Sequence, residues 1–170
     1  IGRHAGAAHE QLVEAQCLAG AARGYPADRA VVVGQVFEDP ARQDESLSEL
    51  MTRLARNTAR TMRGIEGYYR ALFELSLRGQ NVWPPMRRIE AIEAEFVVKL
   101  LVQRGVPVDD KIHKRAHLAI RMMHGQIISA MLHGPGPWAA DDPELHAEFG
   151  LMLMRYLGVE DAGPVKQKKK

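Results

Sequence analysis

Three histidines in the C-terminal half of the chain have a spacing that could serve metal chemistry. His113, His117 and His124 stand four and seven positions apart in one predicted helix, which can bring imidazole rings onto a single ion. A bundle that binds metal through carboxylates would also carry paired Glu-x-x-His motifs, whereas the nearest pattern here is a single Asp110-x-x-His113. We therefore expect no metal and no other cofactor, and interpret the rings as a partly exposed polar face. A pocket-lining role for one or two of them stays open.

Aromatic and methionine side chains in the middle of the chain suggest a second kind of site. Such residues line apolar cavities for small molecules, with Tyr hydroxyls and His nitrogens as polar anchors. They can equally fill a hydrophobic core, which residue types alone favour. The candidate ligand-binding residues are Tyr68, Tyr69, Phe73, Trp83, Met86, Phe96, Met122 and His124.

The sequence carries none of the common catalytic motifs. It contains no Gly-x-Ser-x-Gly elbow, no Gly-rich phosphate loop with Lys, no Cys-x-x-Cys and no His-Glu-x-x-His. The lone Cys17 cannot form an internal disulfide, which fits a reducing cytoplasm. We expect a cytoplasmic protein that is not an enzyme.

A stripe of arginines raises the question of nucleic-acid binding. The arginines recur at three- and four-residue steps and share one face of a predicted helix; they are Arg53, Arg56, Arg60 and Arg63. The net charge is +2, but without the four lysines of residues 166–170 acidic residues outnumber basic ones. Because broad DNA binding needs a basic footprint, a solvated face paired with acids from neighbouring helices is the better explanation. We expect residues 159–170 to form a disordered basic tail.

Sequence patterns typical of helices predict the elements that carry these residues. A modest helix is predicted over 8–22, and 30–37 is ambiguous, with a buried helix or turn favoured. Ser46 and Glu49 form a capping-box pattern that predicts the start of a strong helix. The buried stripe of that helix comprises Leu47, Leu50, Met51, Leu54, Thr58, Met62 and Ile65.

Two further helices are predicted in the centre. A short aromatic helix covers 68–75, and Trp83-Pro84-Pro85 then favours extended backbone, with Pro85 suited to start the next helix. We place Glu90 and Glu93 largely outside the core stripe of that helix, which comprises Met86, Ile89, Ile92, Phe96 and Leu100.

The segment 110–157 is expected to organise the fold. Apolar residues at three- and four-residue steps predict one helix over 110–133, ~36 Å long at ~1.5 Å per residue. Gly125 and Ser129 stand four apart beside the apolar face and would let a second helix approach closely. The Gly- and Pro-rich link 133–138 ends the helix, and Asp141 or Asp142 would cap the next one.

The last predicted helix, over 143–157, is apolar on nearly its whole circumference. Such a helix is buried on more than one side, and a second copy of the same helical hairpin most simply covers the other side. We therefore predict a homodimer built on a four-helix bundle. The predicted interface residues are Ile120, Gly125, Ile128, Ser129, Leu145, Phe149, Met152, Leu153 and Tyr156.

Length and composition favour one all-α domain over residues 1–158. A chain of 170 residues supports one good core but is short for two ordinary domains. No uncharged apolar run approaches the ~18 residues that suggest a membrane span, so no membrane partner is expected.

The order of several short motifs resembles the C-terminal regulatory domain of TetR-family transcriptional regulators. The resemblance is clearest over residues 68–158. The segments that carry it are the aromatic helix, Trp83-Pro84-Pro85, Val102-Gln103-Arg104-Gly105, Ala119-Ile120-Arg121-Met122-Met123-His124-Gly125, Asp141-Asp142-Pro143-Glu144-Leu145 and Met154-Arg155-Tyr156-Leu157-Gly158.

This resemblance implies a homodimer whose last two helices form the shared bundle, together with a cavity for a small apolar effector. Under it, a pocket formed by Tyr69, Phe73, Trp83 and Met122 is as well supported as a core. Effector binding would alter DNA affinity by favouring one of two dimer arrangements.

The family reads DNA through a helix-turn-helix that is not visible in this sequence. We expect that head either upstream of residue 1 or missing from the protein. The alternative function is a stand-alone helical protein-interaction module, without a DNA-binding head or a small-molecule ligand.

Overall fold

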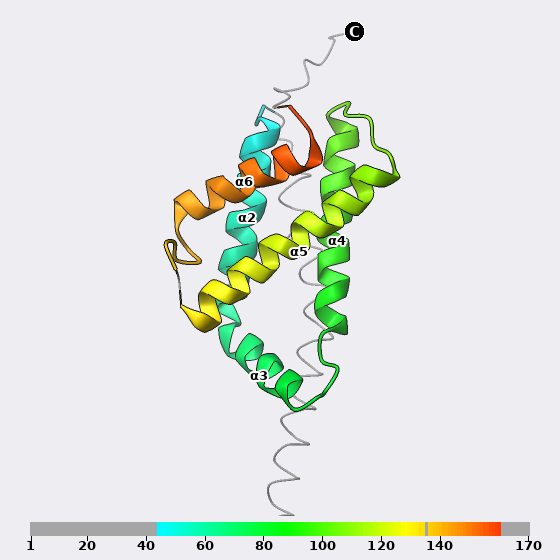
Figure 1. Cartoon of the computed structure of the whole chain (residues 1–170). Coiled ribbons are helices and arrows are strands. Elements are labelled where there is room, and N and C mark those ends of the chain that lie inside the picture. The colour runs from blue at the N-terminus through cyan, green and yellow to red at the C-terminus, as the bar shows by residue number, and fades with distance from the viewer. Residues whose placement is uncertain (1–43, 135, 161–170) are drawn as a thin grey trace, which may run out of the picture.

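The computed structural model describes residues 44–134 and 136–160, which form helices joined by short links (Figure 1). These residues contain no strand, and the predicted all-α fold class is confirmed. The helices are α2 (Leu47–Gly64), α3 (Glu66–Leu77), α4 (Pro84–Gln103), α5 (Asp110–His133) and α6 (Pro143–Leu157). The expectations for 8–22, 30–37, Cys17 and residues 161–170 of the tail lie outside the described residues. The tail was predicted to begin at residue 159, but Val159 N donates to the Met154 carbonyl and its side chain packs against the core.

Local signals set the helix starts. Ser46 Oγ accepts a hydrogen bond from Glu49 N (3.2 Å) and Ser46 N donates to Glu49 Oε2 (2.7 Å), which confirms the capping box of α2. Asp109 Oδ1 accepts from Ile112 N at the start of α5, and Asp142 Oδ1 accepts from Glu144 N at the start of α6, both at 2.8 Å. The chain thus satisfies amide groups that would otherwise lack partners at three helix starts.

The start of α4 differs from the sequence prediction. Trp83 has φ −83° and ψ −15°, in the right-handed helical region, although the following proline disfavours that region. Two contacts account for this conformation: Trp83 Nε1 donates to Ser76 Oγ (3.1 Å), and the Trp83 carbonyl accepts from Arg87 N (3.1 Å). The prediction of extended backbone at Trp83 was therefore wrong.

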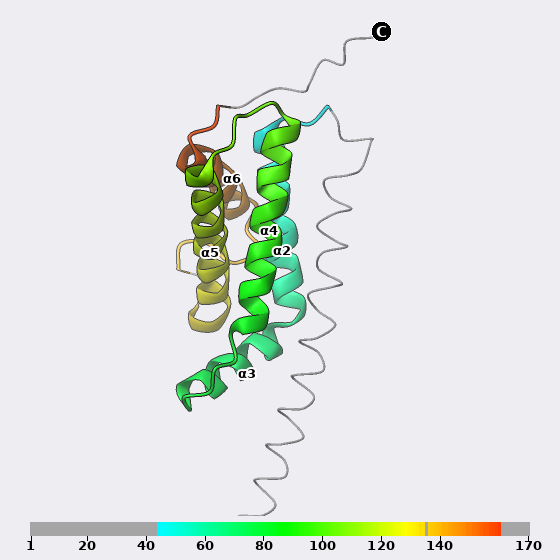
Figure 2. The same cartoon turned by 90° about the vertical axis from the view of Figure 1, so that its right-hand side faces the viewer.

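The helices form two layers. α5 and α6 make the front layer of Figure 1, and α2 with α4 lie behind them, as the turned view in Figure 2 shows. α2 packs most extensively against α6, and α4 packs against α5. α3 lies at one end and connects α2 to α4. None of the described helices has both the length and the apolarity that crossing a lipid bilayer requires.

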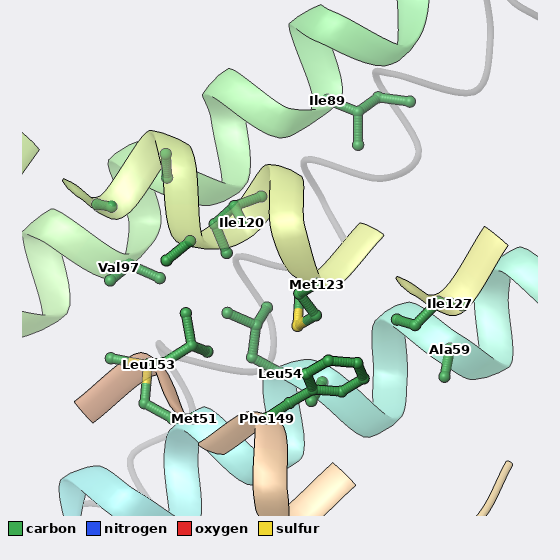
Figure 3. Packing of buried hydrophobic residues seen from close by; sticks show 14 of the residues in the cluster. Met51, Leu54, Ala59, Ile89, Val97, Ile120, Met123, Ile127, Phe149 and Leu153 are labelled. Carbon is green, nitrogen blue, oxygen red and sulfur yellow. The ribbon is translucent and has the colours of Figure 1, made fainter. Parts of the chain in front are cut away.

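Side chains from both layers meet in one apolar core (Figure 3). The predicted buried stripe of α2 is confirmed except at Ile65, which is only partly buried. Each large side chain that is fully buried stabilises the fold by roughly 1.5–3 kcal/mol. The labelled members of this core are Met51, Leu54, Ala59, Ile89, Val97, Ile120, Met123, Ile127, Phe149 and Leu153.

A close helix crossing brings α2 and α6 together at Gly150. A Cβ added there would overlap Thr52 Oγ1 and would lie 3.0 Å from Thr52 N and 3.2 Å from Thr52 Cα. Only glycine permits this approach without movement of the α2 backbone. Close approach of a second helix was predicted at Gly125, but a Cβ there meets nothing within 4 Å in the described chain.

Candidate functional site

The structure separates the eight predicted ligand-binding residues into three environments. Three of them, Tyr69, Met86 and His124, are buried. Tyr68, Phe73, Trp83 and Phe96 are partly buried, while Met122 is 47% exposed on the outer side of α5. Met122 therefore does not share an interior site with the other residues.

A buried polar pair joins α4 to α5. Glu93 is 0% exposed and His124 is 1% exposed, and His124 Nε2 lies 2.7 Å from Glu93 Oε2. Because a carboxylate accepts, the His124 Nε2–H donates in this contact. Thr58 of α2 donates its hydroxyl to the same oxygen at 3.5 Å, so three helices meet at one carboxylate. Buried polar groups of this kind restrict the packing to an arrangement that satisfies them.

The second nitrogen of His124 has no such contact. Its Nδ1 is buried and has no hydrogen-bond partner among the described residues. A neutral imidazole that donates through Nε2 carries a lone pair at Nδ1, and a buried acceptor without a partner is costly. The geometry therefore leaves one interior ring nitrogen whose hydrogen-bonding capacity a ligand could satisfy.

The prediction that Glu93 and Glu90 lie largely outside the core stripe of α4 was wrong. Glu93 lies at the centre of the buried side, and Glu90 is also buried. Arg87 Nη1 lies 3.1 and 2.9 Å from the two Glu90 carboxylate oxygens, and Arg121 Nε lies 3.7 Å from Oε2. Ile92 and Phe96, placed in that stripe, are only partly buried.

A spacing signal could have revealed these acids. Met86, Glu90, Glu93 and Val97 follow steps of four, three and four, the periodicity of a single helix face. Because the two glutamates are charged, they were assigned to the solvent side despite their spacing.

The three histidines do not converge. His113 Nδ1 and His117 Nε2 each lie 3.8 Å from Glu95 Oε1 at the surface, whereas His124 pairs with Glu93 in the interior. Within residues 44–134 and 136–160, no group of three or more His, Cys, Asp or Glu side chains is placed to hold a metal ion.

Aromatic side chains of α3 make edge-to-face contacts. The rings of Tyr68 and Tyr69 meet edge to face at 6.0 Å, and Phe73 meets His133 in the same way at 5.4 Å. Burial raises the pKa of the Tyr68 phenol because it disfavours the phenolate. The Tyr68 hydroxyl therefore remains a hydrogen-bond donor at neutral pH.

An open pocket of about 570 Å³ lies between α2 and the start of α6. We call it the arginine pocket; its lining residues are Thr52, Arg56, Arg60, Arg63, Asp141, Pro143 and His146. Three members of the predicted arginine stripe thus share one concave surface. The fourth, Arg53, pairs with Glu45 and does not line the pocket.

The predicted dimer-interface residues divide into core and surface. Ile120, Leu145, Phe149 and Leu153 are buried in the core of the chain itself and leave almost no surface for a partner. Ile128 and Met152 are partly buried, whereas Gly125, Ser129 and Tyr156 are exposed. The four core residues were assigned to the interface because the sequence does not show which side of α5 or α6 faces the other helices of the same chain.

Exposed residues on α5 and α6 form a surface that we call the outer face. The α5 part follows three- and four-residue steps, and the α6 part does the same. Both helices belong to the front layer of Figure 1. The outer face comprises Lys111, Lys114, Leu118, Met122, Gly125 and Ser129 of α5, with Glu144, Glu148, Leu151 and Arg155 of α6.

Comparisons with protein-family models, curated proteins and solved structures find no match. Three features of the described residues are candidates for function: the buried Glu93–His124 pair, the arginine pocket and the outer face.

Proposed function

We propose that this chain is the effector-binding and homodimerisation domain of a transcriptional repressor similar to the TetR family. DNA contact would be made by a helix-turn-helix outside the described residues. The observation that carries the proposal is the outer face of α5 and α6, where apolar residues stay exposed although the core behind them is already filled.

The outer face suits a second copy of the same chain. α5 is about 36 Å long and α6 about 22 Å, so two helices about 10 Å wide present roughly 600 Å² of projected area. A typical stable interface buries about 800 Å² of accessible surface on each partner, and projected area understates accessible surface. The outer face is therefore large enough for a specific dimer.

Charge supports a two-fold arrangement. Lys111 and Lys114 are exposed on α5, and Glu144 and Glu148 are exposed on α6. In a two-fold dimer the same surface meets itself, so the α5 of one protomer can approach the α6 of the other. Lysines would then face glutamates in two symmetric places, which favours this pairing over others.

The proposed effector site lies around His124. An apolar molecule with one hydrogen-bond donor could satisfy the buried Nδ1 while contacting neighbouring apolar residues. Occupation of a site between α4 and α5 would shift α5, and α5 also carries part of the outer face. Effector binding would thereby be coupled to the arrangement of the dimer. Such coupling regulates DNA binding if the effector has different affinities for the two arrangements.

The concentration dependence of the melting temperature tests the dimer. The melting temperature of a folded dimer rises with protein concentration, because association stabilises the native state by mass action. We expect this rise for the wild type and a much smaller one for Met122→Gln. Leu77→Gln is the matched control, since Leu77 is 75% exposed on α3, away from the outer face.

Two outcomes would count against the dimer. A wild-type melting temperature that does not change over a hundredfold concentration range would remove the main support for a regulator and favour a monomeric interaction module. If the melting temperatures of Met122→Gln and Leu77→Gln rise equally with protein concentration, any association uses another surface of the molecule.

A screen of small apolar compounds tests the effector site. Compounds that carry one O–H or N–H donor should raise the melting temperature of the wild type. Replacing His124 by Leu should abolish the shift, because the ring nitrogen is lost, and the double variant Glu93→Leu/His124→Leu, which leaves no buried carboxylate without its partner, should abolish it too. An undiminished shift in His124→Leu would exclude the interior ring nitrogen as the anchor.

A further inference from the structure

The arginine pocket carries positive charge that the described residues do not neutralise. Arg63 pairs with the Asp141 carboxylate at the rim, and both side chains are exposed. Arg56 and Arg60 are exposed, and no residue of the described chain forms an ion pair or hydrogen bond with either. Asp141 is the one acidic residue of the lining, and Arg63 already occupies it.

The positions of these cations favour an anion in the pocket. Arg56 and Arg60 are four residues apart on α2, a spacing at which like charges repel. Pro143, the first residue of α6, has no N–H, and Asp142 already caps the start of that helix, so the α2 arginines supply the positive charge of the pocket. His146 is buried, and its Nε2–H donates to the Ala140 carbonyl at 3.0 Å. An anion would relieve the repulsion between Arg56 and Arg60 and accept hydrogen bonds from their guanidinium groups.

Size and charge distribution indicate the class of ligand. A pocket of about 570 Å³ is within the usual range for small-molecule sites, roughly 300–1,000 Å³. Guanidinium groups form two parallel hydrogen bonds with phosphate or carboxylate oxygens. Acidic and basic residues are equal in number over the described chain, so the surface lacks the basic footprint of a nucleic-acid binder.

We propose that the arginine pocket binds a small organic anion bearing a phosphate or carboxylate group, held by Arg56 and Arg60. The Thr52 hydroxyl and the rim residue Arg63 border the same space. This site is distinct from the interior effector site, which lies between α4 and α5, and it does not depend on dimerisation.

Calorimetric titration with inorganic phosphate and with citrate, at constant ionic strength, tests the proposal on the full chain. The double variant Arg56→Gln/Arg60→Gln should weaken binding of the preferred anion by at least about tenfold, because two charge-assisted contacts are lost. The control Arg78→Gln/Arg88→Gln removes the same charge from two exposed arginines outside the pocket and should change the affinity by less than about twofold.

The two probes distinguish the two ligand classes. Tighter binding of phosphate indicates a phosphorylated ligand, and tighter binding of citrate indicates a carboxylate.

Without anion, both double variants should melt at or slightly above the wild-type temperature, so a loss of binding cannot be attributed to unfolding. Equal weakening in both double variants would overturn the proposal, as would no binding of either probe by the wild type. Binding of duplex DNA that is lost with Arg56 and Arg60, and that neither probe displaces, would also overturn it in favour of a nucleic-acid surface.

Discussion

Two helix–helix interfaces, which we call seams, stabilise the fold in different ways. The seam between α2 and α6 is closed by shape: apolar side chains surround a crossing at which Gly150 lies against Thr52. The seam between α4 and α5 is closed around a polar contact, the buried Glu93–His124 pair. The first seam should tolerate changes of charge at its edge but not added volume, whereas the second should be sensitive to the loss of either polar partner.

The largest expected effect follows from breaking the polar seam. His124→Leu leaves the Glu93 carboxylate buried without its histidine contact, and removal of one partner of a buried pair costs about 3–5 kcal/mol. The double variant Glu93→Leu/His124→Leu removes both polar groups and should recover much of that loss. Urea denaturation measures each free energy of unfolding. If the losses of Glu93→Leu and His124→Leu sum to the loss of the double variant, the two residues are not coupled.

A smaller effect should follow from adding one methyl group to the shape-dependent seam. Gly150→Ala places a Cβ against the Thr52 backbone, and overpacking of this kind costs about 1–3 kcal/mol, more than the ~1 kcal/mol that alanine gains over glycine in a helix. Gly67→Ala is the matched control, because a Cβ there meets nothing within 4 Å; it should be neutral or slightly stabilising. Equal unfolding free energies for the two variants would contradict the close crossing.

The smallest effect concerns the exposed start of α2, at one end of the shape-dependent seam. Hydrogen bonding from the Ser46 backbone N–H, and then from the Ser46 side chain, lowers the pKa of Glu49 below its usual 4.5. A carboxylate with a lowered folded-state pKa stabilises the fold above the unfolded pKa, and this contribution is lost as pH falls through the folded value. The stability advantage of the wild type over Glu49→Gln should therefore be present at pH 7 and shrink below about pH 4. An advantage that does not change with pH would contradict the capping role of this carboxylate.

The features that sequence reasoning predicted correctly depend on neighbours along the chain. The capping box at Ser46, the bounds of α5 and a cap at Asp141 or Asp142, which the structure assigns to Asp142, follow from residues within four positions of one another. The conformation of Trp83 was missed because a hydrogen bond to Ser76 outweighs the local effect of the following proline.

The features that were missed depend on packing between distant segments. Burial of Glu93 depends on His124, which lies 31 positions further along the chain. The Gly150 crossing depends on Thr52, and the arginine pocket exists because the start of α6 lies beside the α2 arginines. Helix periodicity identifies the side of a helix that is buried, but it does not identify the helix that covers that side.

The mass of the protein in solution tests the central claim, that the outer face of α5 and α6 joins two copies of the chain. Light scattering should give twice the 18.9 kDa chain mass for the wild type and a single chain mass for Gly125→Arg. Among the described residues a Cβ at Gly125 meets nothing within 4 Å, so the arginine is expected to obstruct a partner rather than the fold, and Gly67→Arg serves as a control that should remain dimeric. A wild type of single chain mass, or a Gly125→Arg variant that remains dimeric, would contradict the claim.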